Sequence, residues 1–114
     1  MNKLIISILL FLLGNILIWF QTNGQFLWKW FEKHPISLSF IFGGFISYCF
    51  IFATRYSYQY FDNLIWPGKF VGFSTGIICY AIMTYVLMQE GLTLKTLMSL
   101  FLALLIILIQ VFWK

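Results

Sequence analysis

Few side chains in this sequence are suited to chemistry, and those few are scattered along the chain. The three acidic residues, Glu32, Asp62 and Glu90, all lie between the long apolar segments rather than within them. The single histidine, His34, forms no group with either cysteine, and no Cys-x-x-Cys pair is present. An active site needs positioned acids, bases or nucleophiles, and a metal site needs ligands at recognisable spacing. We therefore expect no enzyme, no metal site and no cofactor.

Asn15 is the polar residue of greatest interest, because it lies deep within the first apolar segment. An asparagine in the interior of a membrane is costly unless it is paired, so it should face protein or a water-filled cavity. Two interpretations stay open. Asn15 either makes a hydrogen bond to another helix or contacts a substrate.

Aromatic residues are abundant, with 14 Phe, 6 Tyr and 5 Trp. A pocket lined by aromatic rings can hold a cation or a planar solute, although packing against lipid or other side chains is the commoner role. The candidate substrate-binding residues are therefore Asn15, Trp19, Tyr48 and Tyr80.

Small residues recur at intervals of four in two of the apolar segments. One stripe contains Gly68, Gly72 and Gly76, and a second contains Gly43 and Ser47. Residues four apart share a helix face, and small ones let another helix backbone approach closely. We expect all five to mediate helix packing. Packing within one bundle is favoured for Gly43 and Ser47, whereas a dimer face and internal packing are equally open for the other stripe.

Arg55, Lys69 and Glu90 lie within two residues of the ends of the second and third apolar segments. Long charged side chains at such positions keep their head groups in the interfacial water. We expect these three residues to be interfacial anchors.

The composition requires a lipid environment for the elements that carry these residues. Hydrophobic residues make up 62% of the 114 residues, charged residues only 9%, and the mean hydropathy is +0.95. A soluble domain needs roughly a quarter of its residues charged. The net charge of +4 is spread thinly, without a cluster of Lys and Arg, so nucleic acid is not an expected partner.

Four apolar segments of about 17–20 residues each have the length needed to cross a hydrocarbon core of about 30 Å. Backbone polar groups must be satisfied internally in lipid, so each segment is predicted to be a helix. The predicted fold is an all-α integral membrane bundle of four transmembrane helices, forming a single domain over residues 1–114. The predicted helices cover residues 4–20, 36–53, 70–88 and 94–113.

The predicted connections are 21–34, 54–69 and 89–93, and the first two are rich in Trp and Tyr, which suit the headgroup level. The first and last connections should lie at one end, opposite both termini. A slight excess of basic residues at the end with the termini favours a cytoplasmic location for both. A signal peptide is the alternative for the first segment, but no small-x-small cleavage site follows it.

A resemblance to a known group covers most of the chain, although each motif in it is short. The sequence resembles short four-helix proteins of unknown function in the drug/metabolite transporter superfamily and, more distantly, the small multidrug resistance exporters. The stretches that carry the resemblance are Asn15-Ile16, Phe20, Gly24, Tyr48-Cys49, Ala53-x-Arg55-x-x-Tyr58-x-Tyr60-Phe61, and Lys69 and Glu90 on either side of the third helix, followed by Lys95.

The sequence departs from that group where the chemistry of transport is concerned. The exporters have an acidic residue within the first helix, in the region where this chain has Asn15. Ser47 and Gly72-Phe73 also replace acidic or amide-containing residues of the pattern. The resemblance implies the fold, but not transport driven by a carboxylate in the membrane.

The expected function is that of a small transporter-like protein that moves a small solute across a bacterial-type inner membrane as a homodimer. Four short helices enclose little volume, so a pathway between two protomers is favoured. The alternative is a non-transporting accessory or scaffold protein. A water-accessible polar cavity around Asn15 would favour the transporter.

Overall fold

The computed structural model describes residues 2–113, which fold into helices joined by short connections. The predicted all-α fold is confirmed, and four of the helices are long and apolar enough to cross a membrane. In order, the elements are α1 (Lys3–Asn23), the 3-10 helix η1 (Gly24–Phe26), α2 (Lys29–Lys33), α3 (Pro35–Tyr60), α4 (Trp66–Met88) and α5 (Leu94–Phe112).

Side-chain caps and one proline define where three of the long helices begin. The Asn2 side chain accepts a hydrogen bond from the amide of Leu4 at 2.7 Å, and the Thr93 hydroxyl accepts one from the amide of Thr96 at 3.3 Å. Such caps satisfy amides that have no partner within the helix. Pro35 opens α3, where its missing N–H has no cost.

The connection between α3 and α4 is shorter than predicted. The α3 helix continues to Tyr60 instead of ending near Ala53, and α4 begins at Trp66. The prediction assigned this Tyr-rich stretch to a loop at the headgroup level, but α3 continues through the stretch without a break. Asp62 and Asn63, at φ 56° and 64°, make the turn that follows. Asp and Asn adopt the left-handed region more readily than most residues.

The first connection is also more ordered than predicted. It contains the end of α1, the η1 turn and the α2 helix instead of an irregular loop. The η1 turn packs closely on α2, because a Cβ atom at Gly24 would collide with the ring of Phe31. Glycine is therefore required for this close approach.

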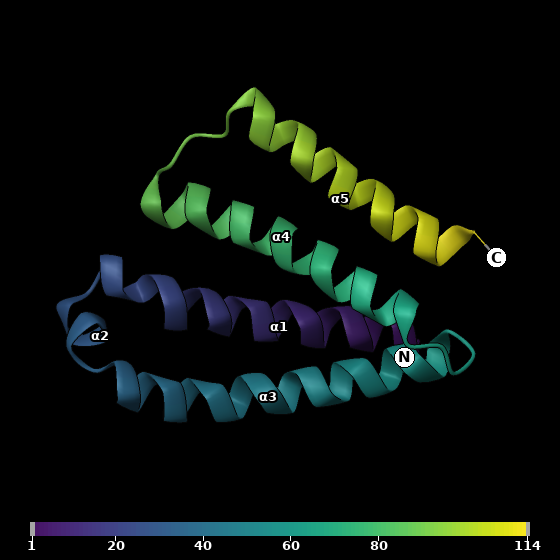
Figure 1. Ribbon diagram of the computed structural model, residues 1–114, viewed down its shortest axis with the longest axis horizontal. Helices are drawn as coiled ribbons and strands as arrows, with labels where there is room; N and C mark the ends of the chain where they lie inside the picture. Colours follow the sequence, from purple (N-terminus) through teal and green to yellow (C-terminus); the bar gives the residue numbers. More distant parts are fainter. Residues whose placement is uncertain (1, 114) are drawn as a thin grey trace.

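The α1 helix is the centre of the bundle, since it lies between α3 and α4 and packs against both (Figure 1). The α5 helix packs chiefly against α4 and lies at the outer edge. Each of α1, α3 and α4 has five buried residues, whereas α5 has only Ala103. The structure thus consists of a three-helix core and one loosely held helix.

Close packing and a buried hydrogen bond hold the core together. Phe11, Ala53 and Val71 form its buried cluster, with one residue from each core helix. The Ser7 hydroxyl of α1 donates to the Ala53 carbonyl of α3 at 2.9 Å. In lipid, helix association depends on such contacts, because apolar surface gains little by leaving a lipid tail.

The glycine stripe of α4 packs as predicted. A Cβ atom at Gly72 would lie 2.9 Å from the Phe11 ring, and one at Gly76 would lie 2.8 Å from Asn15 Oδ1. A Cβ atom at Gly68 would collide with Ser57. These close approaches place Gly68 against α3, and Gly72 and Gly76 against α1, within the bundle.

The prediction of packing within the bundle is wrong for Gly43 and Ser47. The nearest atom to a Cβ at Gly43 is Gln21 Nε2, at 4.0 Å, and Ser47 is exposed. The α3 helix turns another face to the bundle, one that carries Leu38, Ile46, Cys49, Ala53 and Ser57. The alternative for Gly43 and Ser47, contact with a second copy of the chain, stays a prediction.

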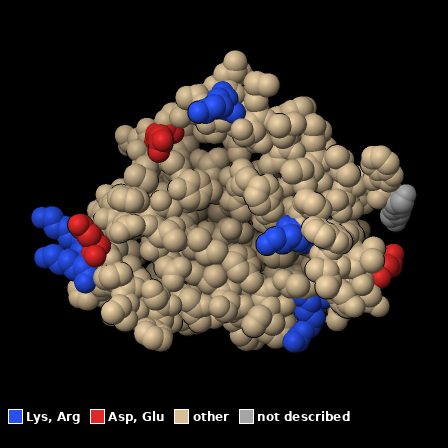
Figure 2. All heavy atoms as spheres, in the orientation of Figure 1, with Lys and Arg blue, Asp and Glu red and all other residues tan. Residues whose placement is uncertain are grey.

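The two ends of the bundle match the predicted arrangement. The termini and the α3–α4 turn lie at one end, while α2 and the α4–α5 connection lie at the other (Figure 1). Most charged side chains visible in Figure 2 lie around the edge of the face that it shows, and a broad uncharged area separates them. Lys114, which contributed to the predicted charge difference between the ends, lies outside the described residues.

Candidate functional site

A hollow of about 500 Å³ lies between α4 and α5 and is closed on a third side by the end of α1. We call it the α4–α5 hollow. Its size falls in the range of about 300–1,000 Å³ that is typical of small-molecule sites. The lining residues are Asn23, Phe26, Ile77, Tyr80, Ala81, Thr84, Tyr85, Met88, Glu90, Gly91, Leu92, Thr96, Ser99 and Leu100.

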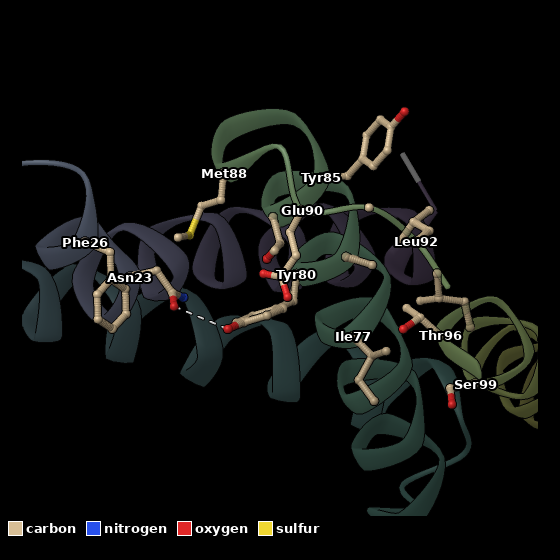
Figure 3. Close-up of a pocket in the computed structure, with 14 residues that line it drawn as sticks. Asn23, Phe26, Ile77, Tyr80, Tyr85, Met88, Glu90, Leu92, Thr96 and Ser99 are labelled. Carbon is tan, nitrogen blue, oxygen red and sulfur yellow. Dashed lines mark hydrogen bonds between the residues drawn. The ribbon is translucent and has the colours of Figure 1, made fainter. Parts of the chain in front are cut away.

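Several hydroxyl and amide groups lie among the apolar side chains that line this hollow (Figure 3). The Tyr80 hydroxyl donates to Asn23 Oδ1 at 3.3 Å and links α4 to the end of α1. Thr96 and Ser99 lie on the α5 side, one helical turn apart. The Ser99 hydroxyl donates to the Lys95 carbonyl at 3.0 Å, so its oxygen can still accept a hydrogen bond.

Glu90 is the acidic residue of the α4–α5 hollow, and it belongs to the connection after α4. Gln89, at φ 55°, takes the left-handed conformation that ends α4. The Glu90 side chain is exposed and lies at the end of the hollow near the connection. This placement gives the hollow a negative charge at its mouth and none in its interior.

Trp19, a predicted substrate contact, is a packing residue instead. Only 1% of its surface is exposed, and its indole N–H donates to the Thr84 hydroxyl at 3.0 Å. Its one donor is therefore used within the protein, and a solute would have to displace the core to reach it. Thr84 also lines the hollow, so this bond holds the wall of the hollow against α1.

A second hollow, of about 430 Å³, contains Asn15. We call it the Asn15 hollow. It lies between α3 and α4 at the end of the bundle that carries the termini, and α1 forms its floor. The lining residues are Phe11, Asn15, Ile18, Phe50, Thr54, Ile65, Gly68, Lys69, Gly72 and Phe73.

Asn15 makes its side-chain hydrogen bond within its own helix, and not to another helix as one of the two interpretations held. Its Nδ2 donates to the Phe11 carbonyl of the same helix at 2.7 Å. The reason is the small size of Gly76, which faces the Asn15 amide and offers no side-chain group to bond. The alternative interpretation, that Asn15 contacts a solute, is compatible with its place on the floor of the hollow.

Tyr48 lies away from both hollows. Its side chain is 64% exposed on the outer face of α3, where its ring packs against Phe52 at 4.8 Å between centroids. The four predicted substrate contacts are therefore not brought together. Asn15 lines one hollow and Tyr80 the other, whereas Trp19 is buried between helices and Tyr48 faces the surroundings.

The two predicted basic anchors differ in their surroundings. The Arg55 guanidinium stacks over the Phe52 ring at 4.6 Å, a cation–π contact on the outside of α3. Lys69 lines the Asn15 hollow and is exposed at its edge. Of the three predicted anchors, Lys69 and Glu90 thus each border one of the two hollows.

The α4 helix contributes to both hollows from opposite halves. Its residues up to Phe73 line the Asn15 hollow, and its residues from Ile77 onward line the α4–α5 hollow. Between them, Gly76 packs directly on Asn15. The two hollows therefore approach the middle of the bundle from opposite ends, one between α4 and α5 and the other between α3 and α4.

Sequence reasoning missed Asn23, Thr96 and Ser99 as lining residues. Asn23 was assigned to a connection, although it is the last residue of α1. Thr96 and Ser99 are three residues apart, so they share a helix face. This spacing of two hydroxyl residues was the signal in the sequence that could have identified them as lining residues.

Within residues 2–113, no three His, Cys, Asp and Glu side chains gather closely enough to hold a metal ion. No protein-family model, curated protein or solved structure matches the chain. The fold and the hollows define the class instead, which is an all-α bundle of four apolar helices of membrane-spanning length.

Proposed function

We propose that the chain is a small transporter-like protein of the drug/metabolite type that moves a small solute across a bacterial-type inner membrane. The observation that supports this best is the pair of hollows that approach the middle of one bundle from opposite ends. Hollows that reach a bundle from both ends are compatible with alternating access, in which rigid elements move around a site near the middle of the membrane. The proposed orientation has both termini in the cytoplasm.

The α5 helix is the element suited to move. It has one buried residue, and it packs chiefly on α4, so its displacement disrupts little of the core. Transport requires rigid elements that shift against each other around a site. Movement of α5 relative to α4 would change the width of the α4–α5 hollow directly.

The lining of the α4–α5 hollow favours a solute with hydrogen-bonding groups. Tyr80, Thr96 and Ser99 offer hydroxyls, and the Asn23 amide is at the end near Glu90. Such groups, once shielded from water, favour a solute that pairs with them over an apolar one of equal size.

A homodimer is part of the proposal because neither hollow is enclosed by one chain. The α5 helix leaves large apolar side chains exposed, among them Phe101, Leu104 and Leu108. A second copy packed along α5 would cover the open side of the α4–α5 hollow. Crosslinking of single-cysteine variants at these positions in native membranes tests the contact.

Flux into proteoliposomes tests transport directly. The probes are ethidium as a planar cation, glycine betaine as a zwitterion and glycerol as a neutral solute. We expect at least one of them to enter faster than into protein-free liposomes. Ser99→Phe, which fills the α4–α5 hollow, should abolish that flux.

Ser39→Phe is the matched control for this substitution. Ser39 is also an exposed helical serine whose hydroxyl donates to the carbonyl four residues earlier, at 2.8 Å, but it lines neither hollow. Flux should survive in this variant. If the folded wild-type protein accelerates none of the three probes, transport is contradicted, and a non-transporting accessory or scaffold protein becomes the better description.

A further inference from the structure

The Asn15 hollow carries a lysine where the α4–α5 hollow carries a glutamate, and the proposed transport does not account for this difference in charge. Its walls are mostly apolar, with Phe11 and Ile18 from α1, Phe50 from α3 and Phe73 from α4. None of the ten residues that line it is acidic. An apolar cavity with few polar groups is the usual form of a site for a small ligand.

Lys69 is the charged group of this hollow. It lies in α4 close to the start of the helix and is exposed at the edge of the hollow. The first turn of α4 contains no acidic residue, and Ile65 provides no side-chain cap. The start of a helix carries a partial positive charge, so Lys69 adds a second positive charge where an anion would be stabilised.

Asn15 provides the polar group at the floor of the hollow. Its amide nitrogen is already bonded to Phe11, and its Oδ1 atom is directed toward Gly76, which has no side chain to donate. Thr54 is the other uncharged polar residue of the lining, and rings and aliphatic side chains make up most of the rest. The hollow is therefore positive at its edge and mostly apolar inside.

We propose that the Asn15 hollow binds a single-chain anionic amphiphile, namely a fatty carboxylate, with the carboxylate on Lys69 and the hydrocarbon chain against Phe11, Phe50 and Phe73. The charge of the edge and the apolar interior complement the two parts of such a molecule. A volume of about 430 Å³ suits one hydrocarbon chain rather than the two chains of a phospholipid. This site is separate from the α4–α5 hollow, and the proposal does not depend on transport.

Binding of radiolabelled laurate to the full chain in phosphatidylcholine nanodiscs tests the proposal. We expect saturable binding above the partition into empty discs. Dodecyltrimethylammonium, which has the same chain and the opposite charge, should compete at least about tenfold less well, because a charge-assisted hydrogen bond contributes about 1.5–3 kcal/mol.

Two substitutions locate the site, and each has a matched control. Lys69→Gln should weaken laurate binding about tenfold or more, for the same reason. Lys95→Gln, which changes an exposed lysine near the start of α5 that lines neither hollow, should not. Thr54→Trp should abolish binding by filling the hollow, whereas Thr22→Trp, at an exposed threonine outside both hollows, should leave it intact.

Several results would overturn this assignment. Laurate binding that is not saturable would show partition into the bilayer only. If dodecyltrimethylammonium competed as well as unlabelled laurate, the charge of the ligand would have no role in binding. If Lys69→Gln binds laurate as the wild-type protein does, and thermal unfolding shows that the variant is folded, the carboxylate lies elsewhere. Displacement of laurate by phosphatidylglycerol in the disc would mean that a two-chain lipid occupies the hollow.

Discussion

The two hollows share one helix, yet they differ in charge and in the helices that form their walls. The Asn15 hollow is bordered by α1 and by α3 and α4, which both pack on α1, and it carries Lys69. The α4–α5 hollow is bordered by the loosely held α5, and it carries Glu90 and several hydroxyls. The hollow with Lys69 is suited to hold an anionic group, whereas the hollow with α5 as one wall would change in width if α5 moved.

Small residues on α4 make this difference possible. Gly68, Gly72 and Gly76 bring the first half of the helix onto α1 and α3. Its second half contacts the core through the Trp19–Thr84 bond and the Tyr80–Asn23 bond instead. The first half thus depends on close backbone packing and the second half on side-chain hydrogen bonds.

The largest effect is expected from Gly76→Leu, which would force α4 away from Asn15. Overpacking of a tight contact usually costs about 1–3 kcal/mol, and thermal unfolding in detergent measures the loss. The control is Gly44→Leu, because a Cβ atom at Gly44 meets nothing within 4 Å. Equal melting temperatures for the two variants would contradict the packing of α4 on α1.

A smaller effect is expected from Thr84→Val, which keeps the shape of the side chain and removes the acceptor of the Trp19 indole N–H. Interhelical hydrogen bonds in membranes contribute about 0.6 kcal/mol on average and up to about 1.7. Thr84→Ser should restore most of the lost stability, which chemical unfolding in mild detergent can measure. Thr22→Val, at an exposed threonine bonded within its own helix, should cost less than Thr84→Val; the reverse order would argue against a structural role for the Trp19 bond.

No effect is expected when a pH gradient is imposed on flux. All three acidic residues lie outside the four long helices. A carboxylate can exchange a proton for a cation when it lies at mid-depth in the membrane, where desolvation raises its pKa. Uptake in proteoliposomes should be the same with and without the gradient. Cation uptake that needs the gradient, survives Asn15→Ala and is lost in Glu90→Gln would make Glu90 the coupling group.

The fold was largely predictable from the sequence because spanning length and apolar composition dictate helices in lipid. The C-terminal end of α3 was not, since Arg55 and the tyrosines that follow suit both an interfacial helix and a loop. The glycine stripe of α4 was predicted correctly, but the same spacing misled at Gly43 and Ser47. Spacing shows which residues share a face and not which face meets the bundle.

The candidate site was predictable only in part. Asn15 and Tyr80 line hollows, because a polar or half-polar side chain deep in a helix tends to face a gap or a partner. Their separation into two hollows depends on how far α3 and α5 diverge from α4, which no local pattern encodes. Trp19 could not be distinguished from a ligand contact before its bond to Thr84 was seen.

Sidedness of cysteine labelling tests the central claim, which is that the two hollows open at opposite ends of the bundle. In a background with Cys49→Ala and Cys79→Ala, Ser99→Cys reports on the α4–α5 hollow and Thr54→Cys on the Asn15 hollow. Ala103→Cys, at a buried position of α5, is the unreactive control. A membrane-impermeant maleimide applied to one face of sealed vesicles should label one reporter only, and the opposite face should label the other. Labelling of both reporters from the same face would contradict the account.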